Sequence, residues 1–266
     1  MEFYYVFFLL VSSSRLFAFQ DEYVVPVSDY YNSNSNRLLE ERRANILEAP
    51  FMAVIFADIS FEHLCPYSIG VIVSSRWILT TAKALKWQSG KDLKVLVGLD
   101  DITRIQEKVN TYGYSVDKQV LHSDYKLNEV YNDIALIKVI SDIRFSDRVQ
   151  IITLMTYSDL MQHEYEYQHM INVTVYNYGS KNEASKNYLK RSFISVNTRV
   201  VDLNERLFVA AQNTLPTCYG DSGSPAIVQG KLVGLLIVEY SCGLKYPNVF
   251  TGILHYSDWI NNAMYE

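Results

Sequence analysis

The segment that decides the fold is TCYGDSGSP, residues 217–225. A serine between an acidic residue and a glycine suits a hydroxyl displayed on a tight backbone bend, so Ser222 is the candidate nucleophile. The N–H groups of Gly220 and Ser222 would together form an oxyanion hole. Because a serine hydroxyl is a poor nucleophile by itself, the segment predicts that another part of the chain supplies a general base.

Composition and charge limit the classes of function. The chain has 266 residues, of which 49% are hydrophobic and 20% charged, enough for one or two substantial cores. Its net charge of -5, without a run of like charges, argues against a nucleic-acid footprint and against a membrane-surface patch. The three cysteines fit no zinc-ligand spacing, so we expect no metal and no cofactor.

The N-terminus predicts export from the cell. A short apolar run from Phe3 to Val11, followed by small residues, is typical of a signal peptide cut near Ala18, although Glu2 is atypical of its first region. A membrane anchor is the alternative, but a spanning helix needs about 18 apolar residues or more. We expect residues 1–18 to be the signal peptide and residues 19–37 a polar leader or propeptide. The mature protein would then be secreted, in an oxidising compartment, and would not be inserted in a membrane.

After the leader, short β-branched and aromatic runs are separated by turn residues, which predicts an all-β sandwich or barrel. Residues 256–264 have apolar side chains at helical spacing after Ser257-Asp258 and predict a short C-terminal helix. The expected strands are residues 52–56, 70–73, 77–80, 93–97, 134–140, 149–154, 171–176, 193–196, 232–238 and 249–253.

Three motifs in order resemble the trypsin-like (chymotrypsin-fold) serine proteases. They are WILTTA at residues 77–82, NDIALI at residues 132–137 and GDSGSP at residues 220–225. The resemblance covers the chain from about Arg37 to its end and implies two packed six-stranded antiparallel β-barrels with the active site between them. It places the protease-type domain at residues 38–266, with one barrel at about 50–150 and the other at about 151–255.

The resemblance fills two of the three catalytic positions. It puts the nucleophile at Ser222, the oxyanion glycine at Gly220 and the aspartate that orients the base at Asp133. Where the family has histidine, the chain has Lys83. Bringing a lysine of usual pKa about 10.4 to a useful value requires roughly 4 kcal/mol, and a neighbouring carboxylate favours the ammonium instead. We therefore expect Lys83 to be a structural cation, with a role as general base as the alternative. The five histidines fall outside the base position and are interpreted as ordinary surface or satisfied side chains: His63, His122, His163, His169 and His255.

The specificity pocket also departs from the family. Pro216 stands at its base, where an aspartate would select Lys or Arg. Val238 and Glu239 fall on the wall that binds the substrate backbone, and Asn248 replaces a pocket-lining glycine. The resemblance thus implies a narrowed or filled pocket. It also puts Ser68 and Ala84 at the positions of a cysteine pair that braces the histidine loop.

The resemblance also implies that cleavage of the chain near its N-terminus activates the protein. Cleavage after Arg37 would free the amino group of Leu38 to pair with Asp221. Glu40 and Glu41 replace two flexible glycines and bring like charge towards Asp221, which weakens the switch.

The resemblance pairs Cys218 with Cys242 in a disulfide, which could contribute about 3 kcal/mol in the chain-entropy account. Cys65 is left over, either as a buried free thiol or as an intermolecular disulfide. Asn172-Val173-Thr174 is a glycosylation sequon within an expected strand.

These features predict a secreted serine protease homologue that has lost catalysis and acts by binding a protein, such as a protease, an inhibitor or a substrate protein, as a regulator or cofactor in extracellular proteolysis. The alternative enzyme is an active serine endopeptidase that uses Ser222 with Lys83 as its base. A third alternative is a secreted storage or structural protein.

Overall fold

A computed structural model describes ten parts of the chain. The chain divides into two compact units, Met1–Asn34 and Ser35–Glu266, and every described residue belongs to the second. The expected signal peptide and the leader up to residue 37 therefore lie outside the described residues. The described parts are residues 42–57, 67–87, 92–102, 113–127, 129–162, 170–178, 190–197, 207–210, 221–237 and 248–265.

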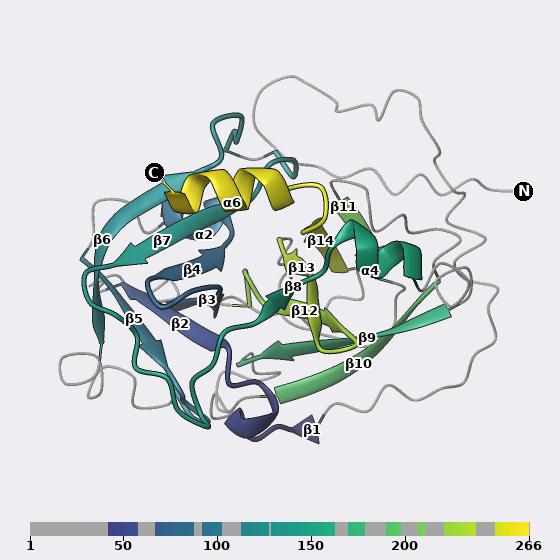
Figure 1. Ribbon diagram of the computed structural model, residues 1–266, viewed down its shortest axis with the longest axis horizontal. Helices are drawn as coiled ribbons and strands as arrows, with labels where there is room; N and C mark the ends of the chain where they lie inside the picture. Colours follow the sequence, from purple (N-terminus) through teal and green to yellow (C-terminus); the bar gives the residue numbers. More distant parts are fainter. Residues whose placement is uncertain are drawn as a thin grey trace, which may run out of the picture. The chain divides into compact units, whose positions relative to one another are not determined.

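Six antiparallel strands in the first half close into a barrel, in the order β2-β3-β4-β7-β6-β5 (Figure 1). A glycine in β3 lets two of the strands lie close together, because a Cβ at Gly70 would lie 2.7 Å from Ile78 Cγ2 and 2.9 Å from Leu79 O. The barrel strands are β2 (Met52–Ala57), β3 (Tyr67–Ile72), β4 (Trp77–Thr80), β5 (Leu93–Val97), β6 (Tyr114–Leu121) and β7 (Ala135–Val139).

Strand β2 shows why the barrel strands are continuous apolar runs. All six of its residues are buried, and successive side chains point to opposite faces. Ile55 belongs to the cluster inside the barrel, with Ile78 and Val95. Its neighbour Val54 belongs to a second cluster that also contains Leu235 from the other half of the chain. A strand buried on both faces reads as an unbroken hydrophobic run.

The second half of the chain forms an eight-stranded sheet. Seven strands follow the order β1-β10-β9-β12-β13-β14-β11, and the short β8 pairs parallel with β13. Strand β11 also lies in contact with β10, which brings the two ends of the series β10-β9-β12-β13-β14-β11 together. The strands are β1 (Arg42–Arg43), β8 (Thr153–Leu154), β9 (Met170–Asn177), β10 (Lys190–Asn197), β11 (Leu207–Ala210), β12 (Pro225–Val228), β13 (Lys231–Leu236) and β14 (Asn248–Gly252).

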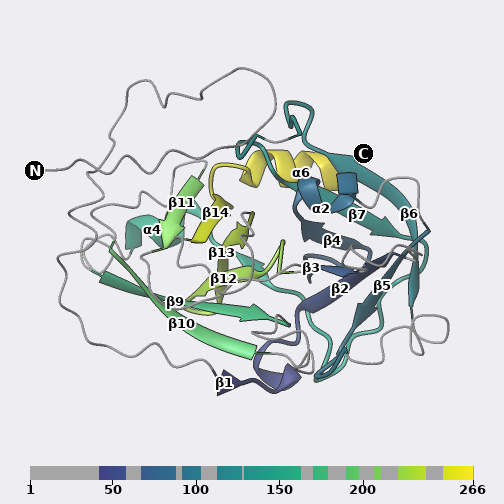
Figure 2. The same ribbon diagram turned by 180° about the vertical axis from the view of Figure 1, so that it is seen from behind.

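The expected C-terminal helix is present as α6 (Ser257–Tyr265), which buries Ile260 and Ala263. It lies in contact with β7 of the barrel (Figures 1 and 2). Three short helical elements were not predicted: η1 (Ile46–Glu48), α2 (Ala82–Trp87) and α4 (Tyr157–Gln162). A mostly β protein with a six-stranded barrel, a second sheet and a short C-terminal helix is therefore confirmed.

Several strands were not predicted from the sequence, and one predicted strand is longer than the observed one. Strand β6 was missed because its middle residues, Asp117 to Gln119, are exposed and polar, so it lacks an apolar run. Strands β1, β11 and β12 are only two to four residues long and were also missed. The strand expected at residues 149–154 is limited to β8, because Val149 instead pairs with Ser146 across a turn.

Candidate active site

Lys83 and Asp133 meet at the start of helix α2. The helix begins at Ala82, directly after β4, so the N–H of Lys83 lies in the first turn, where it has no acceptor within the helix. Asp133 Oδ1 accepts a hydrogen bond from this N–H at 2.7 Å. Asp133 is 2% exposed, whereas Lys83 is partly exposed. Because the bond is made by the main chain of Lys83, any residue except proline at this position could donate it.

The loop that carries Asp133 is fixed from the second half of the chain. Thr251 Oγ1, in β14, donates to the main-chain oxygen of Asp133 at 3.0 Å. Asn132 has a positive φ of 58°, a conformation that asparagine tolerates better than most residues. Its N–H donates to Tyr256 Oη at 3.1 Å, and Tyr256 Oη donates to Asn132 Oδ1 at the same distance. These hydrogen bonds hold the loop of Asp133, and with it the carboxylate, in place.

The pKa of Tyr125 reflects the negative charge of Asp133. Burial raises the pKa of its hydroxyl above the usual range, and the negative charge of Asp133 raises it further. Tyr125 is therefore a neutral phenol at neutral pH. The same negative charge favours a cation over a neutral group in its neighbourhood.

Ser222 lies on a tight turn before β12. Ser224 N donates to Asp221 O at 3.0 Å across the turn, and Gly223 has a positive φ of 87°. A Cβ at Gly223 would lie 1.9 Å from Ile69 O, so only glycine fits between the turn and β3. Ile69 N in turn donates to Ser222 O at 2.9 Å. The turn is therefore hydrogen-bonded directly to strand β3 of the barrel.

The Ser222 hydroxyl contacts a residue that the sequence did not single out. Ser222 Oγ lies 2.9 Å from Thr81 Oγ1, and both residues are buried. Thr81 is the residue between β4 and α2, two positions before Lys83. The segment from Thr81 to Lys83 thus brings together the elements that carry Ser222 and Asp133. The one signal in the sequence was a second threonine beside Thr80 at the end of an apolar strand.

Other expected site residues are only partly placed. Asp221 is fully buried. The backbone of Asn248 pairs with Ala210, and that of Asn172 pairs with Ser195 within β9 and β10. The remaining ones lie outside the described residues: Gly220, Pro216, Val238, Glu239, Arg37, Leu38, Cys65, Cys218 and Cys242.

The described histidines lie beside aromatic rings of the C-terminal segment. The ring of His122 is 5.5 Å from that of Tyr256 and 5.2 Å from that of Trp259. His122 Nδ1 also accepts a hydrogen bond from Asp124 N at 3.2 Å. His255 is exposed and stacks edge-on against Tyr256. His63, His163 and His169 lie outside the described residues.

Comparison with known proteins identifies the family. Residues 39–260 match the family described as Trypsin. The chain belongs to the trypsin family. A relative, venom serine protease 34 from Apis mellifera, is 29% identical over 245 residues, which are 85% of this chain and 58% of the relative. The chain therefore spans little more than half of that protein. A trypsin from Phaedon cochleariae is 24% identical over 237 residues, covering 82% of this chain and 84% of the relative.

A solved structure supports the trypsin fold. Neuropsin, a serine protease expressed in the limbic system of mouse brain, matches with a TM-score of 0.63 and 22% identity. The match covers 85% of this chain and all of the neuropsin chain. At this identity, the similarity establishes the fold.

Within the described residues, no group of three or more His, Cys, Asp or Glu side chains is placed to hold a metal ion. The helices of the described parts are all too short or too polar to span a bilayer.

Proposed function

We propose that this trypsin-family chain is a pseudoprotease, with Ser222, Asp133 and Lys83 at the catalytic positions and no working base. The observation that carries the proposal is the hydrogen bond from the Lys83 main chain to Asp133 Oδ1. This bond gives Asp133 a role in capping helix α2 that needs no side chain at position 83. Retention of the aspartate is therefore explained without catalysis.

The chemistry of lysine supports the same proposal. A general base must accept the serine proton, whereas an ammonium group only donates hydrogen bonds. In addition, the Ser222 hydroxyl is engaged with Thr81 rather than exposed to solvent. An active endopeptidase with Lys83 as its base remains the alternative enzyme.

We propose further roles for residues that the family resemblance singles out. Gly220 and Ser222 form the oxyanion hole. Cleavage after Arg37 pairs Leu38 with Asp221. The altered specificity pocket is lined by Pro216, Val238, Glu239 and Asn248, and these larger side chains limit its use as a substrate pocket.

The remaining proposals concern maturation. Residues 1–18 act as a signal peptide, residues 19–37 as a leader, and residues 38–266 as the protease-type domain of a secreted protein. Cys218 and Cys242 form a disulfide, and Cys65 is either a buried free thiol or the site of an intermolecular disulfide. Asn172 is the glycosylation site of the sequon at residues 172–174.

The fold and the relatives support a proposal for the class of partner. Relatives carry the names venom serine protease and trypsin, and such enzymes act on proteins. A chain that keeps their fold without turnover would bind a protease, an inhibitor or a substrate protein. We therefore propose a regulator or cofactor in extracellular proteolysis. The proteins that co-purify with the chain from its native extracellular fluid would identify the partner.

Labelling with a serine-directed fluorophosphonate tests the loss of catalysis. The purified protein, cleaved after Arg37, should remain unlabelled, because no base activates Ser222. Ser222→Ala is the control for labelling elsewhere. Stoichiometric labelling of the unmodified protein, absent in Ser222→Ala, would establish the Ser222–Lys83 enzyme instead.

Lys83→His alone should restore little peptidase activity, because the pocket wall is also altered. Turnover of a peptide library by this variant at rates typical of the family would contradict this prediction.

A further inference from the structure

The contact between Thr81 and Ser222 joins two distant parts of the chain inside the candidate site. Their hydroxyl oxygens are 2.9 Å apart although the residues are 141 positions apart in sequence. Thr81 is fully buried and Ser222 is 4% exposed. One hydroxyl follows strand β4 of the barrel, and the other lies on the turn before β12 of the second sheet. This is a specific bond between the candidate nucleophile and the opposite half of the fold.

The Thr81 hydroxyl joins Ser222 to the first turn of helix α2. Thr81 Oγ1 accepts a hydrogen bond from Ala84 N at 3.4 Å, in the first turn of α2. A hydroxyl has one hydrogen to donate and two lone pairs that accept. Either hydroxyl can therefore donate in the bond between Thr81 Oγ1 and Ser222 Oγ. In both directions the bond ties together two buried hydroxyl groups that would otherwise lose a partner.

We propose that Thr81 is a positioning residue that latches the Ser222 side chain to the barrel and lowers the reactivity of its hydroxyl. The bond fixes the Ser222 side chain towards Thr81, so attack on a substrate requires the bond to be broken. The latch rests on the proposed loss of catalysis, because it acts as a second barrier beside Lys83. A buried hydrogen bond between neutral groups is worth about fivefold in an equilibrium or a rate.

The neighbouring threonine provides a matched control. Thr80 is also fully buried and is the last residue of β4, but its Oγ1 donates to Ile69 O at 2.7 Å. Thr80→Val removes one buried hydroxyl bond without removing the bond to Ser222. Thr81→Val removes the latch with little change in shape, and Thr81→Ser keeps a hydroxyl at that position.

The first experiment measures reactivity after a base has been introduced. In the Arg37-cleaved Lys83→His protein, diisopropyl fluorophosphate would phosphorylate Ser222: an O–P bond forms, the P–F bond breaks, fluoride leaves and the serine proton passes to histidine. Adding Thr81→Val should raise the second-order labelling rate about fivefold. Adding Thr81→Ser or Thr80→Val should leave the rate close to that of Lys83→His. Equal rates for Thr81→Val and Thr81→Ser would overturn the latch.

The second experiment needs no reactivity and uses the native Lys83 protein. Thr81→Val and Ser222→Ala are combined in a double-mutant cycle, and urea unfolding gives the equilibrium constant of each variant. We expect the two changes to be coupled by about fivefold in that constant, because each alone leaves the other hydroxyl buried without its partner. Additive effects would overturn the latch even if no variant were labelled.

The two proposals fail in different ways. Labelling of the unmodified protein at Ser222 would refute the loss of catalysis, and the double-mutant cycle would still decide whether the Thr81 bond exists. An additive cycle together with an unlabelled native protein would refute the latch alone. A small organophosphate is the suitable probe, because it depends little on the altered specificity pocket.

Discussion

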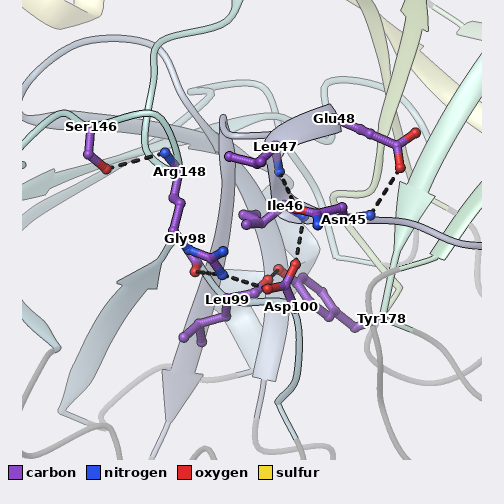
Figure 3. Close-up of polar contacts among 10 residues, drawn as sticks. All are labelled: Asn45, Ile46, Leu47, Glu48, Gly98, Leu99, Asp100, Ser146, Arg148 and Tyr178. Atoms are coloured by element: carbon purple, nitrogen blue, oxygen red, sulfur yellow. Dashed lines mark hydrogen bonds and ion pairs between the residues drawn. The ribbon is translucent and has the colours of Figure 1, made fainter.

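Two aspartates, Asp133 at the candidate site and Asp100 after strand β5, cap short helices in the same way. Asp133 Oδ1 accepts from the Lys83 N–H at 2.7 Å at the start of α2. Asp100 Oδ1 accepts from the Ile46 N–H at 2.6 Å at the start of η1 (Figure 3). Carboxylates are favourable at helix N-termini because the free N–H groups and the helix dipole attract negative charge there. The two corners differ in what else surrounds the carboxylate.

Asp100 lies near the surface within a set of local bonds. Arg148 donates through one nitrogen to Asp100 Oδ2 at 2.5 Å and to Gly98 O at 3.1 Å. Beside it, Tyr178 Oη donates to Leu99 O at 2.6 Å (Figure 3). Glu48 and Asn45 complete a capping box on η1. These contacts explain Asp100 as a structural joint between the N-terminal segment, β5 and β9.

Asp133 is more deeply buried than Asp100, whose side chain is 30% exposed. A hydrogen bond from Thr251 holds the main chain of Asp133, and the charge of Asp133 contributes to the raised pKa of Tyr125. The comparison shows that one helix-capping device serves both a structural joint and the candidate site. An aspartate at the position that the resemblance assigns to catalysis is therefore not evidence of catalysis in this chain.

The largest effect is expected from removing the buried carboxylate. Asp133→Ala leaves the partly buried Lys83 N–H without its acceptor and should lower the free energy of unfolding by about 3 kcal/mol, the upper range for a hydrogen bond to a charged group. Urea unfolding followed by tryptophan fluorescence measures the change. Asp133→Asn is the matched control, because its amide oxygen can still accept the N–H, and it should lose about 1 kcal/mol. A loss in Asp133→Asn as large as in Asp133→Ala would mean that the negative charge, and not the cap, is what the fold needs.

A smaller effect is expected at the structural joint. Asp100→Ala removes the acceptor for Ile46 N and for Arg148, and should cost about 2 kcal/mol, because the site is partly exposed and solvent weakens charged contacts there. Arg148→Ala keeps the cap on η1 and should cost only about 1 kcal/mol. If Arg148→Ala cost as much as Asp100→Ala, the ion pair would be more important at this corner than the cap.

Asp100 also predicts a dependence of stability on pH. Partial burial raises the pKa of Asp100, but the hydrogen bonds from Arg148 and Ile46 and the charges of Arg148 and Arg43 outweigh it, so the pKa is lowered overall. The unfolded chain then binds the proton more tightly than the folded one, so this contribution is complete above the ordinary aspartate pKa of about 3.9 and is lost as the pH falls below it. Asp100→Asn should flatten the acid limb of the stability curve between about pH 5 and pH 2. An unchanged acid limb in that variant would assign the loss to other carboxylates.

The sequence predicted an element or a site residue well where a buried apolar run or a family motif marked it. Strand β2 was predicted well because all six of its residues are buried, whereas β6 was missed because its exposed middle carries no apolar signal. Position 83 stood out because a lysine interrupts a motif in which the resemblance implies histidine. Such departures can be read from the chain alone.

The contacts that define the site could not be read in this way. The bond between Thr81 and Ser222 depends on how the barrel packs against the second sheet, and no local pattern specifies that packing. The main-chain bond from Lys83 to Asp133 was equally hidden, because no sequence pattern specifies a main-chain contact between two distant segments. Both follow from tertiary placement of helix α2, an element of six residues that the sequence did not predict.

The smallest effect is expected from changing position 83 itself. Lys83→Ala removes the ammonium but keeps the N–H that Asp133 accepts, so it should change the free energy of unfolding by only about 0.5 kcal/mol, the range for partly exposed charges. Urea unfolding beside Asp133→Ala and Arg148→Ala gives the comparison. Lys83→Pro is the contrasting variant, because it deletes the N–H and should lose nearly as much as Asp133→Ala. If Lys83→Ala proved as costly as Asp133→Ala, the side chain of Lys83 would be the structural partner of the carboxylate, and the equivalence between the two aspartate corners would fail.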